Sequence, residues 1–269
     1  MDSGGKTQSF WEHLDDLRHS LIRVVIAAAV LAVAAFCFKE TLFSVVLAPQ
    51  KSGFITYRLL ARLSAWMGSP MGDFSVPLIN TGLARQFVIH MKTALWAGVI
   101  LASPYILYQI FRFVSPALYT NEKHYAVRVA GSGYVLFLVG VAVGYFLIFP
   151  LTFRFLGTYT VSGDIANLIS LDSYISTLMS MCLTMGIVFE IPVLCWLFGK
   201  LGFLSVSFMK RYRKHAIVII VFAAAIITPT SDVFTLAVVS LPMYLLYEAG
   251  IFLVRRTGRK RPAELPVQE

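Results

Sequence analysis

Long apolar runs constrain the fold of this chain more than any other feature of its sequence. Four of them lie at residues 21–38, 87–111, 126–151 and 174–198. A helix needs about 20 mostly apolar residues to cross the hydrocarbon core of a bilayer, so each run is long enough to do so. A further apolar block at 216–254 is interrupted by the turn-like sequence TPTSD at 228–232, which leaves arms of about 12 and 22 residues.

These runs predict an all-α integral membrane protein with six transmembrane helices, of which the last two are short. Composition agrees, because 58% hydrophobic and 14% charged residues with a mean hydropathy of +0.74 exclude an ordinary soluble domain. The three cysteines lie inside apolar runs without a CxxC pair, so they indicate neither a disulfide framework nor a metal site.

The distribution of lysine and arginine predicts the orientation of the helices. With the N-terminus in the cytoplasm, basic residues gather in the cytoplasmic flanks, above all at 210–214 and near the C-terminus. This bias places both termini in the cytoplasm. The net charge of +9 then serves mainly to orient the helices beside anionic lipid headgroups, and we expect no nucleic-acid partner.

We expect residues 1–269 to form a single membrane domain. Its N-terminal part, 1–20, is predicted to be a cytoplasmic amphipathic segment that continues into the first span, since apolar residues recur there at helical spacing. A long outer loop at 39–86 carries a short amphipathic helix around Leu59–Met67. A basic cytoplasmic tail covers 255–269.

An acidic residue within the fourth apolar run points to function. Glu190 lies in GIVFEIPVLCW, about 12 Å from the inner end of the run by helical rise. Intramembrane acids usually face a bundle interior or a water-filled cavity, and Pro192 frees a backbone carbonyl in the same turn. The alternative is a protonated, structural glutamate that is hydrogen-bonded to a neighbouring helix. A second acid, Glu248, is expected to pair with Arg255 or Lys214.

Two further acids, Asp16 and Glu122, lie at the predicted cytoplasmic face and could converge there. Two carboxylates beside an apolar interface can bind a ligand with adjacent arginines, because each guanidinium forms a bidentate, charge-assisted pair. The alternative for either acid alone is an ordinary solvated surface position.

Motifs of soluble enzymes are missing: there is no HExxH, GxSxG, Walker loop or GxGxxG after a strand. We therefore expect no enzymatic activity, no catalytic residue, no cofactor and no metal. A proton-coupled secondary transporter that uses Glu190 remains an alternative function, although no internal repeat is visible. An intramembrane enzyme would need a second catalytic group, for which Glu248 is the candidate.

The order of motifs resembles the TatC family, the polytopic subunit of the twin-arginine protein translocase. The resemblance extends from Phe10 to about Arg256. It is carried by FWEHLDDLR, by SPYILYQIFRFVSPALYTNE at 103–122, and by FLIFP, GIVFEIPV, ITPTSD and LPMYLLYE further along the chain.

This resemblance implies a non-enzymatic receptor in the prokaryotic cytoplasmic (inner) membrane that supports transport of folded proteins. Its implied partners are twin-arginine signal peptides, small single-span subunits of the TatA/TatB type, the lipid bilayer and further copies of the chain. Signal-peptide binding is implied for Asp16, Arg18, Phe113 and Glu122. The same resemblance implies that the helices form a concave bundle with Glu190 on its hydrated face. The resemblance also implies structural roles for Pro116, Leu118, Tyr119, Pro192 and Asp232.

Overall fold

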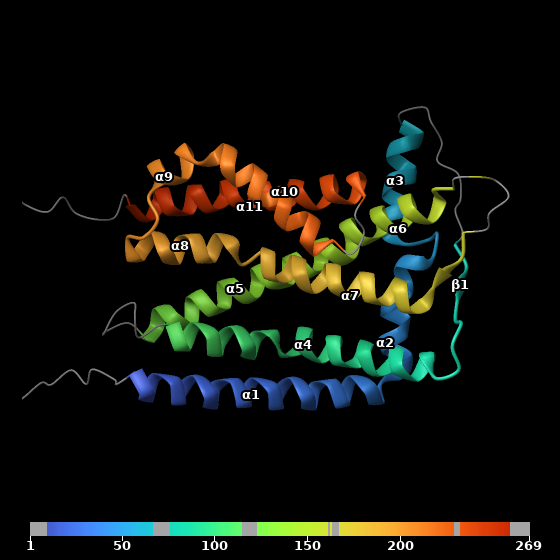
Figure 1. Cartoon of the computed structure of the whole chain (residues 1–269), viewed down its shortest axis with the longest axis horizontal. Helices are drawn as coiled ribbons and strands as arrows, with labels where there is room; N and C mark the ends of the chain where they lie inside the picture. Colours follow the sequence, from blue (N-terminus) through green and yellow to red (C-terminus); the bar gives the residue numbers. More distant parts are fainter. Residues whose placement is uncertain are drawn as a thin grey trace, which may run out of the picture. The chain divides into compact units, whose positions relative to one another are not determined.

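The computed structural model describes residues 10–66, 76–114, 123–160, 162, 167–228 and 232–258. The described residues are almost entirely helical (Figure 1): α1 (Phe10–Cys37), α2 (Lys39–Val46), η1 (Ala48–Gln50), α3 (Ile55–Trp66), α4 (Arg85–Val114), α5 (Lys123–Val143), the π-helical turn η3 (Gly144–Ile148), α6 (Phe149–Thr158), α7 (Leu171–Val188), α8 (Ile191–Leu201), α9 (Val206–Arg211), α10 (Arg213–Ile227) and α11 (Val233–Gly258). Two short strands, β1 (Leu78–Ile79) and β2 (Ile169–Ser170), pair in parallel.

Within the described part of the chain, five helical segments are long and apolar enough to cross a membrane: Leu17–Cys37, Arg85–Phe113, Ala130–Thr158, Leu171–Leu201 and Val233–Arg256. The fifth expected span, α10, has 15 residues and is therefore only about 22 Å long. Its crossing stays a prediction. α11 has 26 residues, which corrects the expectation that both final spans are short.

The chain folds into two compact units, of which the first comprises Met1–Phe43 and Gln86–Tyr134. In it α1 and α4 run antiparallel (Figure 1) and pack where Gly98 of α4 meets Ala32 of α1. A Cβ at Gly98 would lie 2.6 Å from the Ala32 nitrogen, so only glycine allows this approach. Nearby, the buried His90 ring stacks on Phe36 with centroids 4.0 Å apart.

The second unit comprises Ser44–Arg85 and Val135–Glu269. Its centre is a close crossing of α5 and η3 with α7. A Cβ at Gly140 would lie 2.4 Å from the Met185 carbonyl oxygen, and one at Gly186 would lie 2.7 Å from the Phe137 ring. Small residues let helix backbones approach closely, which replaces the missing hydrophobic drive between helices in lipid.

The inner part of the second unit is the packing of α8 along α11. Gly250 of α11 leaves room for the Cys195 sulfur of α8, 3.0 Å from the position of a Cβ. α8 ends at Leu201 and is followed by Gly202, whose φ of 87° is the left-handed conformation that glycine adopts without strain.

Tyrosine hydroxyls attach the outer segment to the spanning helices of the second unit. Tyr57 of α3 donates to the Pro49 carbonyl at 3.0 Å and to the Pro150 carbonyl at 3.2 Å. Tyr145 and Tyr174 donate in the same way to the carbonyls of Val45 and Val46. Burial raises the pKa of the Tyr57 hydroxyl, so this donor stays protonated.

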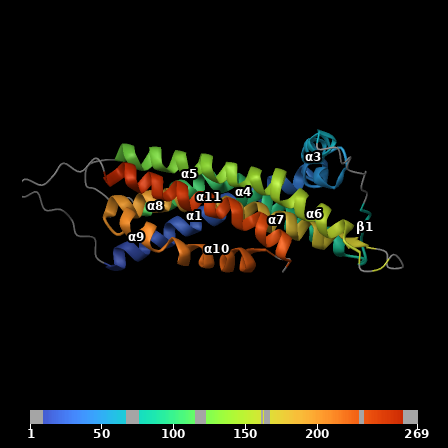
Figure 2. The same ribbon diagram turned by 90° about the horizontal axis from the view of Figure 1, so that it is seen from above.

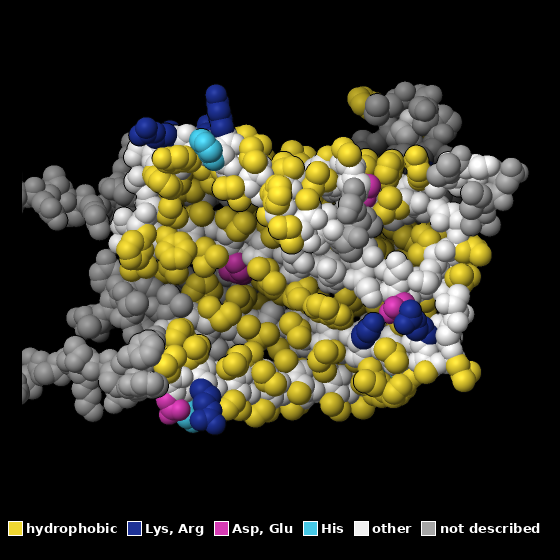
Figure 3. Space-filling view, in the orientation of Figure 1, with side chains coloured by type: hydrophobic (Ala, Val, Ile, Leu, Met, Phe, Trp, Pro, Cys, Tyr) yellow, Lys and Arg dark blue, Asp and Glu magenta, His cyan; other side chains and the backbone are white. Residues whose placement is uncertain are grey.

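Figure 3 shows how hydrophobic and charged side chains are distributed over one face of the surface. Hydrophobic side chains cover the middle of the long helices, and the visible Lys and Arg side chains lie near the ends. This distribution suits helices whose middles face lipid hydrocarbon and whose ends face headgroups.

Candidate functional site

Glu190 lies at a break between two helices inside one apolar segment. α7 ends at Val188 and α8 begins at Ile191, so Glu190 is the residue that precedes α8. Pro192 has no backbone N–H and cannot donate to the carbonyl four residues earlier, which explains the break. α8 continues to Leu201, so Glu190 lies about 16 Å from the inner helix end, deeper than predicted.

The Glu190 side chain is buried at 8% exposure. Neither carboxylate oxygen has a hydrogen-bond partner among the residues that the structure describes. A carboxylate without such a partner is costly to bury, because the desolvation of an unpaired charge is not offset. The predicted alternative, a structural hydrogen bond to a neighbouring helix, is therefore absent from the described part of the chain.

The first unit holds two of the residues implied in signal-peptide binding, and their helices bring them to the same end of this unit. Counted from the Gly98–Ala32 contact, Arg18 lies about 21 Å along α1 and Phe113 about 22 Å along α4, in the same direction because the helices are antiparallel. Arg18 is exposed and Phe113 is half-buried.

Several predicted residues cannot be placed. Position 16 belongs to α1, about 24 Å from Ala32, but the Asp16 side chain lies outside the described residues. Pro116, Leu118, Tyr119 and Glu122 lie outside them entirely. The convergence of Asp16 and Glu122 therefore stays a prediction.

Glu248 has a different partner from either expected one. Its carboxylate accepts from the Arg213 guanidinium at 2.6 Å and from the Tyr244 hydroxyl at 3.2 Å. Arg213 is the first residue of α10 and Glu248 lies in α11, so this ion pair joins the two helices. The prediction of Arg255 or Lys214 as partner is wrong, and the acid has a structural role.

Asp232 caps α11. Its Oδ1 accepts from the Thr235 backbone N–H at 2.7 Å and thereby satisfies one of the free donors at the helix N-terminus. The preceding helix, α10, ends at Ile227, and the hydroxyl of the next residue, Thr228, donates to the Ala224 carbonyl. The turn between these helices thus begins and ends in side-chain hydrogen bonds.

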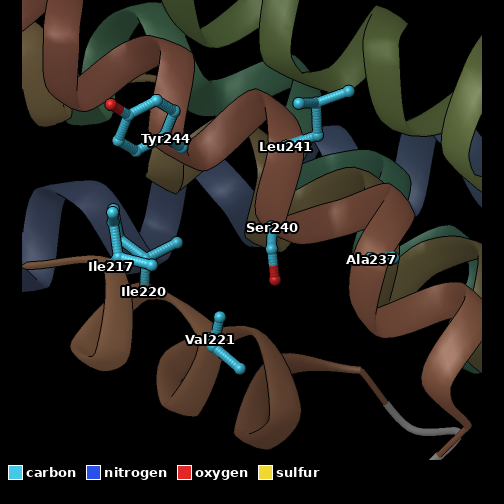
Figure 4. Close-up of a pocket in the computed structure, with 7 residues that line it drawn as sticks. All are labelled: Ile217, Ile220, Val221, Ala237, Ser240, Leu241 and Tyr244. Carbon is cyan, nitrogen blue, oxygen red and sulfur yellow. The ribbon is translucent and has the colours of Figure 1, made fainter. Parts of the chain in front are cut away.

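An apolar pocket of about 320 Å³ lies between α10 and α11 (Figure 4). It is lined by Ile217, Ile220, Val221, Ala237, Ser240, Leu241 and Tyr244. Its polar groups are the hydroxyls of Ser240 and Tyr244, and the lining residues carry no charge.

Two buried polar residues in α4 were not singled out from the sequence. Ser103 is 3% exposed and Gln109 is 4% exposed, and Gln109 donates to the Tyr105 hydroxyl at 2.6 Å. The Ser103 hydroxyl and the Gln109 carbonyl oxygen have no partner among the described residues. The sequence signal for both residues was a polar side chain inside an apolar run.

Across the described residues, no group of three His, Cys, Asp or Glu side chains could hold a metal ion.

Comparisons with known proteins agree with the order of motifs. The family model described as Sec-independent protein translocase protein (TatC) matches residues 12–242. The chain is 37% identical to TatC of Desulforapulum autotrophicum over 95% of this chain and 87% of the relative. It is 34% identical to TatC of a Blattabacterium from Periplaneta americana, over 94% and 97% of the two chains.

Solved structures agree as well. A crystal structure of the twin-arginine translocase receptor TatC superposes with a TM-score of 0.73 at 33% identity, and the match covers 92% of this chain and 100% of that one.

Proposed function

Since the chain belongs to the TatC family, we propose that it is the subunit that binds twin-arginine signal peptides at the cytoplasmic face of the translocase. As a member of this family it is a multi-pass inner-membrane component of the Sec-independent protein translocase, works with other Tat subunits and is not an enzyme. We further propose that the bound peptides are twin-arginine signal peptides and that the other subunits are small single-span proteins.

The antiparallel packing of α1 on α4 carries this proposal. The Gly98–Ala32 contact sets the register of the two helices, so helix positions 16 and 18 of α1 and position 113 of α4 come to the same end of the unit. Glu122 lies in the connection between α4 and α5 and immediately precedes Lys123, the first residue of α5. Asp16 and Glu122 would then each pair with one guanidinium, and Phe113 would offer an apolar surface beside them.

Glu190 has a separate role in the proposal. A buried carboxylate without a partner among the described residues is tolerated where water or a polar partner group reaches it. We place it on the hydrated concave face of a single six-helix membrane domain, where small single-span subunits of the TatA/TatB type and further copies of the chain assemble around the cargo.

The test is a binding comparison with purified full-length protein. Wild type, Asp16→Asn, Glu122→Gln and the double variant are each titrated with a signal peptide that carries Arg-Arg or Lys-Lys. Each single variant should weaken Arg-Arg binding about 10- to 30-fold, since loss of one partner of a close charge pair costs roughly 2 kcal/mol at a wet edge. Lys-Lys should bind more weakly to wild type, because an ammonium lacks the planar fork.

Because both acids would bind one ligand, the losses should not add, and the double variant should retain little Arg/Lys discrimination. A double variant that prefers Arg-Arg as strongly as wild type would place the recognition site elsewhere. Arg112→Gln is the matched control, since it removes a charge near the same end of α4 without removing an acid. A secondary transporter would bind no such peptide at all.

A further inference from the structure

One side of α3 is exposed although it carries large apolar residues. Relative exposure is 47% for Ile55, 54% for Leu59 and 86% for Trp66. Arg58 and Arg62 are exposed on the same helix. Because residues four apart share a helix face, Arg58, Arg62 and Trp66 form one stripe, with Ile55 and Leu59 beside it.

The opposite side of α3 is firmly attached to the second unit. Thr56 and Tyr57 are buried, at 6% and 3% exposure. The Thr56 hydroxyl donates to the Phe146 carbonyl, and the Tyr57 hydroxyl donates to the carbonyls of Pro49 and Pro150. The orientation of the exposed stripe is therefore fixed by buried hydrogen bonds to the spanning helices.

The direction of α3 places this stripe along a membrane surface. In Figure 1, and again after the quarter turn of Figure 2, α3 runs across the direction of α7. α7 belongs to the apolar segment Leu171–Leu201, which is long enough to span the bilayer. A helix perpendicular to a spanning helix of the same unit lies parallel to the membrane plane.

We propose that α3 docks on the membrane itself, with Arg58 and Arg62 on the phosphates of anionic phospholipids and Trp66 and Leu59 in the interfacial layer. This inference goes beyond signal-peptide binding and does not depend on it. The orientation predicted from basic residues assigns the docked leaflet to the non-cytoplasmic side.

The chemistry of the stripe favours lipid over a protein partner. Tryptophan concentrates at the membrane–water interface, and an interfacial helix combines basic residues with aromatic and aliphatic ones. Neither guanidinium forms an ion pair with any residue that the structure describes, and both arginines are exposed. An arginine fork also matches two phosphate oxygens.

The experiment follows Trp66 in the full-length chain. Trp11, Trp96 and Trp196 are replaced by phenylalanine, and single copies are reconstituted in nanodiscs of phosphatidylcholine with increasing phosphatidylglycerol. Docking predicts a blue-shifted Trp66 emission that increases with phosphatidylglycerol and is quenched by lipids brominated near the headgroup. In Arg58→Gln/Arg62→Gln, the phosphatidylglycerol fraction for half the shift should rise roughly fivefold or more, because both cationic contacts to anionic lipid are lost.

Lys51→Gln is the matched control, because Lys51 is an exposed basic residue of the same outer segment but lies outside α3. It should keep the wild-type response, and the melting temperature should be equal in all variants. The proposal is overturned if Trp66 emission is the same with and without phosphatidylglycerol and is quenched by aqueous iodide. A blue shift seen only with two or more copies in each nanodisc would also overturn it, in favour of contact between chains.

Discussion

The guanidinium of Arg213 lies 2.6 Å from the Glu248 carboxylate and joins the start of α10 to the middle of α11. Tyr244 donates to the same carboxylate from one helical turn away. α10 is the shortest expected span, and this ion pair adds to the apolar packing that holds it against α11.

Glu248→Ala is expected to destabilise the protein by about 1–2 kcal/mol, because it leaves Arg213 without its carboxylate. The value is below that of a fully buried pair, since the Arg213 side chain is 43% exposed and therefore partly screened. Thermal unfolding of the purified protein in detergent measures the loss. Arg256→Ala, at an exposed position of the same helix, should change the melting temperature little. Additive losses in an Arg213→Ala/Glu248→Ala cycle would contradict the coupling.

Gly98→Ala is expected to separate α1 from α4. The new Cβ would lie 2.6 Å from the Ala32 nitrogen and 2.7 Å from its Cα, so backbone must shift, at a cost of about 1–3 kcal/mol. Gly131→Ala is the control, because a Cβ there meets nothing within 4 Å and alanine favours the helix. Melting temperature and peptide affinity should both fall in Gly98→Ala alone. Equal stability of the two variants would show that this contact does not set the helix register.

Glu190→Leu is expected to fold at least as well as wild type and to transport poorly. Leucine removes a carboxylate that has no partner among the described residues, so the desolvation cost disappears together with the polar group. Glu190→Gln keeps hydrogen-bonding capacity and should retain more activity. Export of a twin-arginine reporter is measured at equal protein levels in the membrane. Full export by Glu190→Leu would remove the support for a hydrated site.

Six crossings with both termini inside predict opposite sides for two exposed serines, Ser52 in the outer segment and Ser207 in α9. In a background that lacks Cys37, Cys182 and Cys195, a membrane-impermeant thiol reagent should label Ser52→Cys in intact cells. It should label Ser207→Cys only after the inner face is opened. Labelling of both from outside would mean that one of the second to fourth spans does not cross, because Ser207 follows the fourth span and precedes α10.

The span pattern could be read from sequence because it is a local property. Run length and flanking charge decide whether a segment crosses, and four of the five long candidates coincide closely with the apolar runs. The break at Glu190 was also foreseeable in part, since Pro192 disrupts the helix wherever it packs. The motifs that resemble the TatC family are also short contiguous stretches of sequence, and the family match over residues 12–242 includes most of them.

Tertiary structure decided which partners meet. Several basic residues were within sequence reach of Glu248, and the rotation of α10 against α11 selected Arg213. Tyrosine hydroxyls form hydrogen bonds between residues as distant in sequence as Tyr174 and Val46, whose carbonyl accepts the bond. Glycines at 98 and 140 become important only where another backbone approaches. Such contacts depend on helix register and rotation, which arise from the packing of all neighbours together. Apolar run length therefore determined the membrane class, and packing alone determined the ion pairs and the side of α3 that remains exposed.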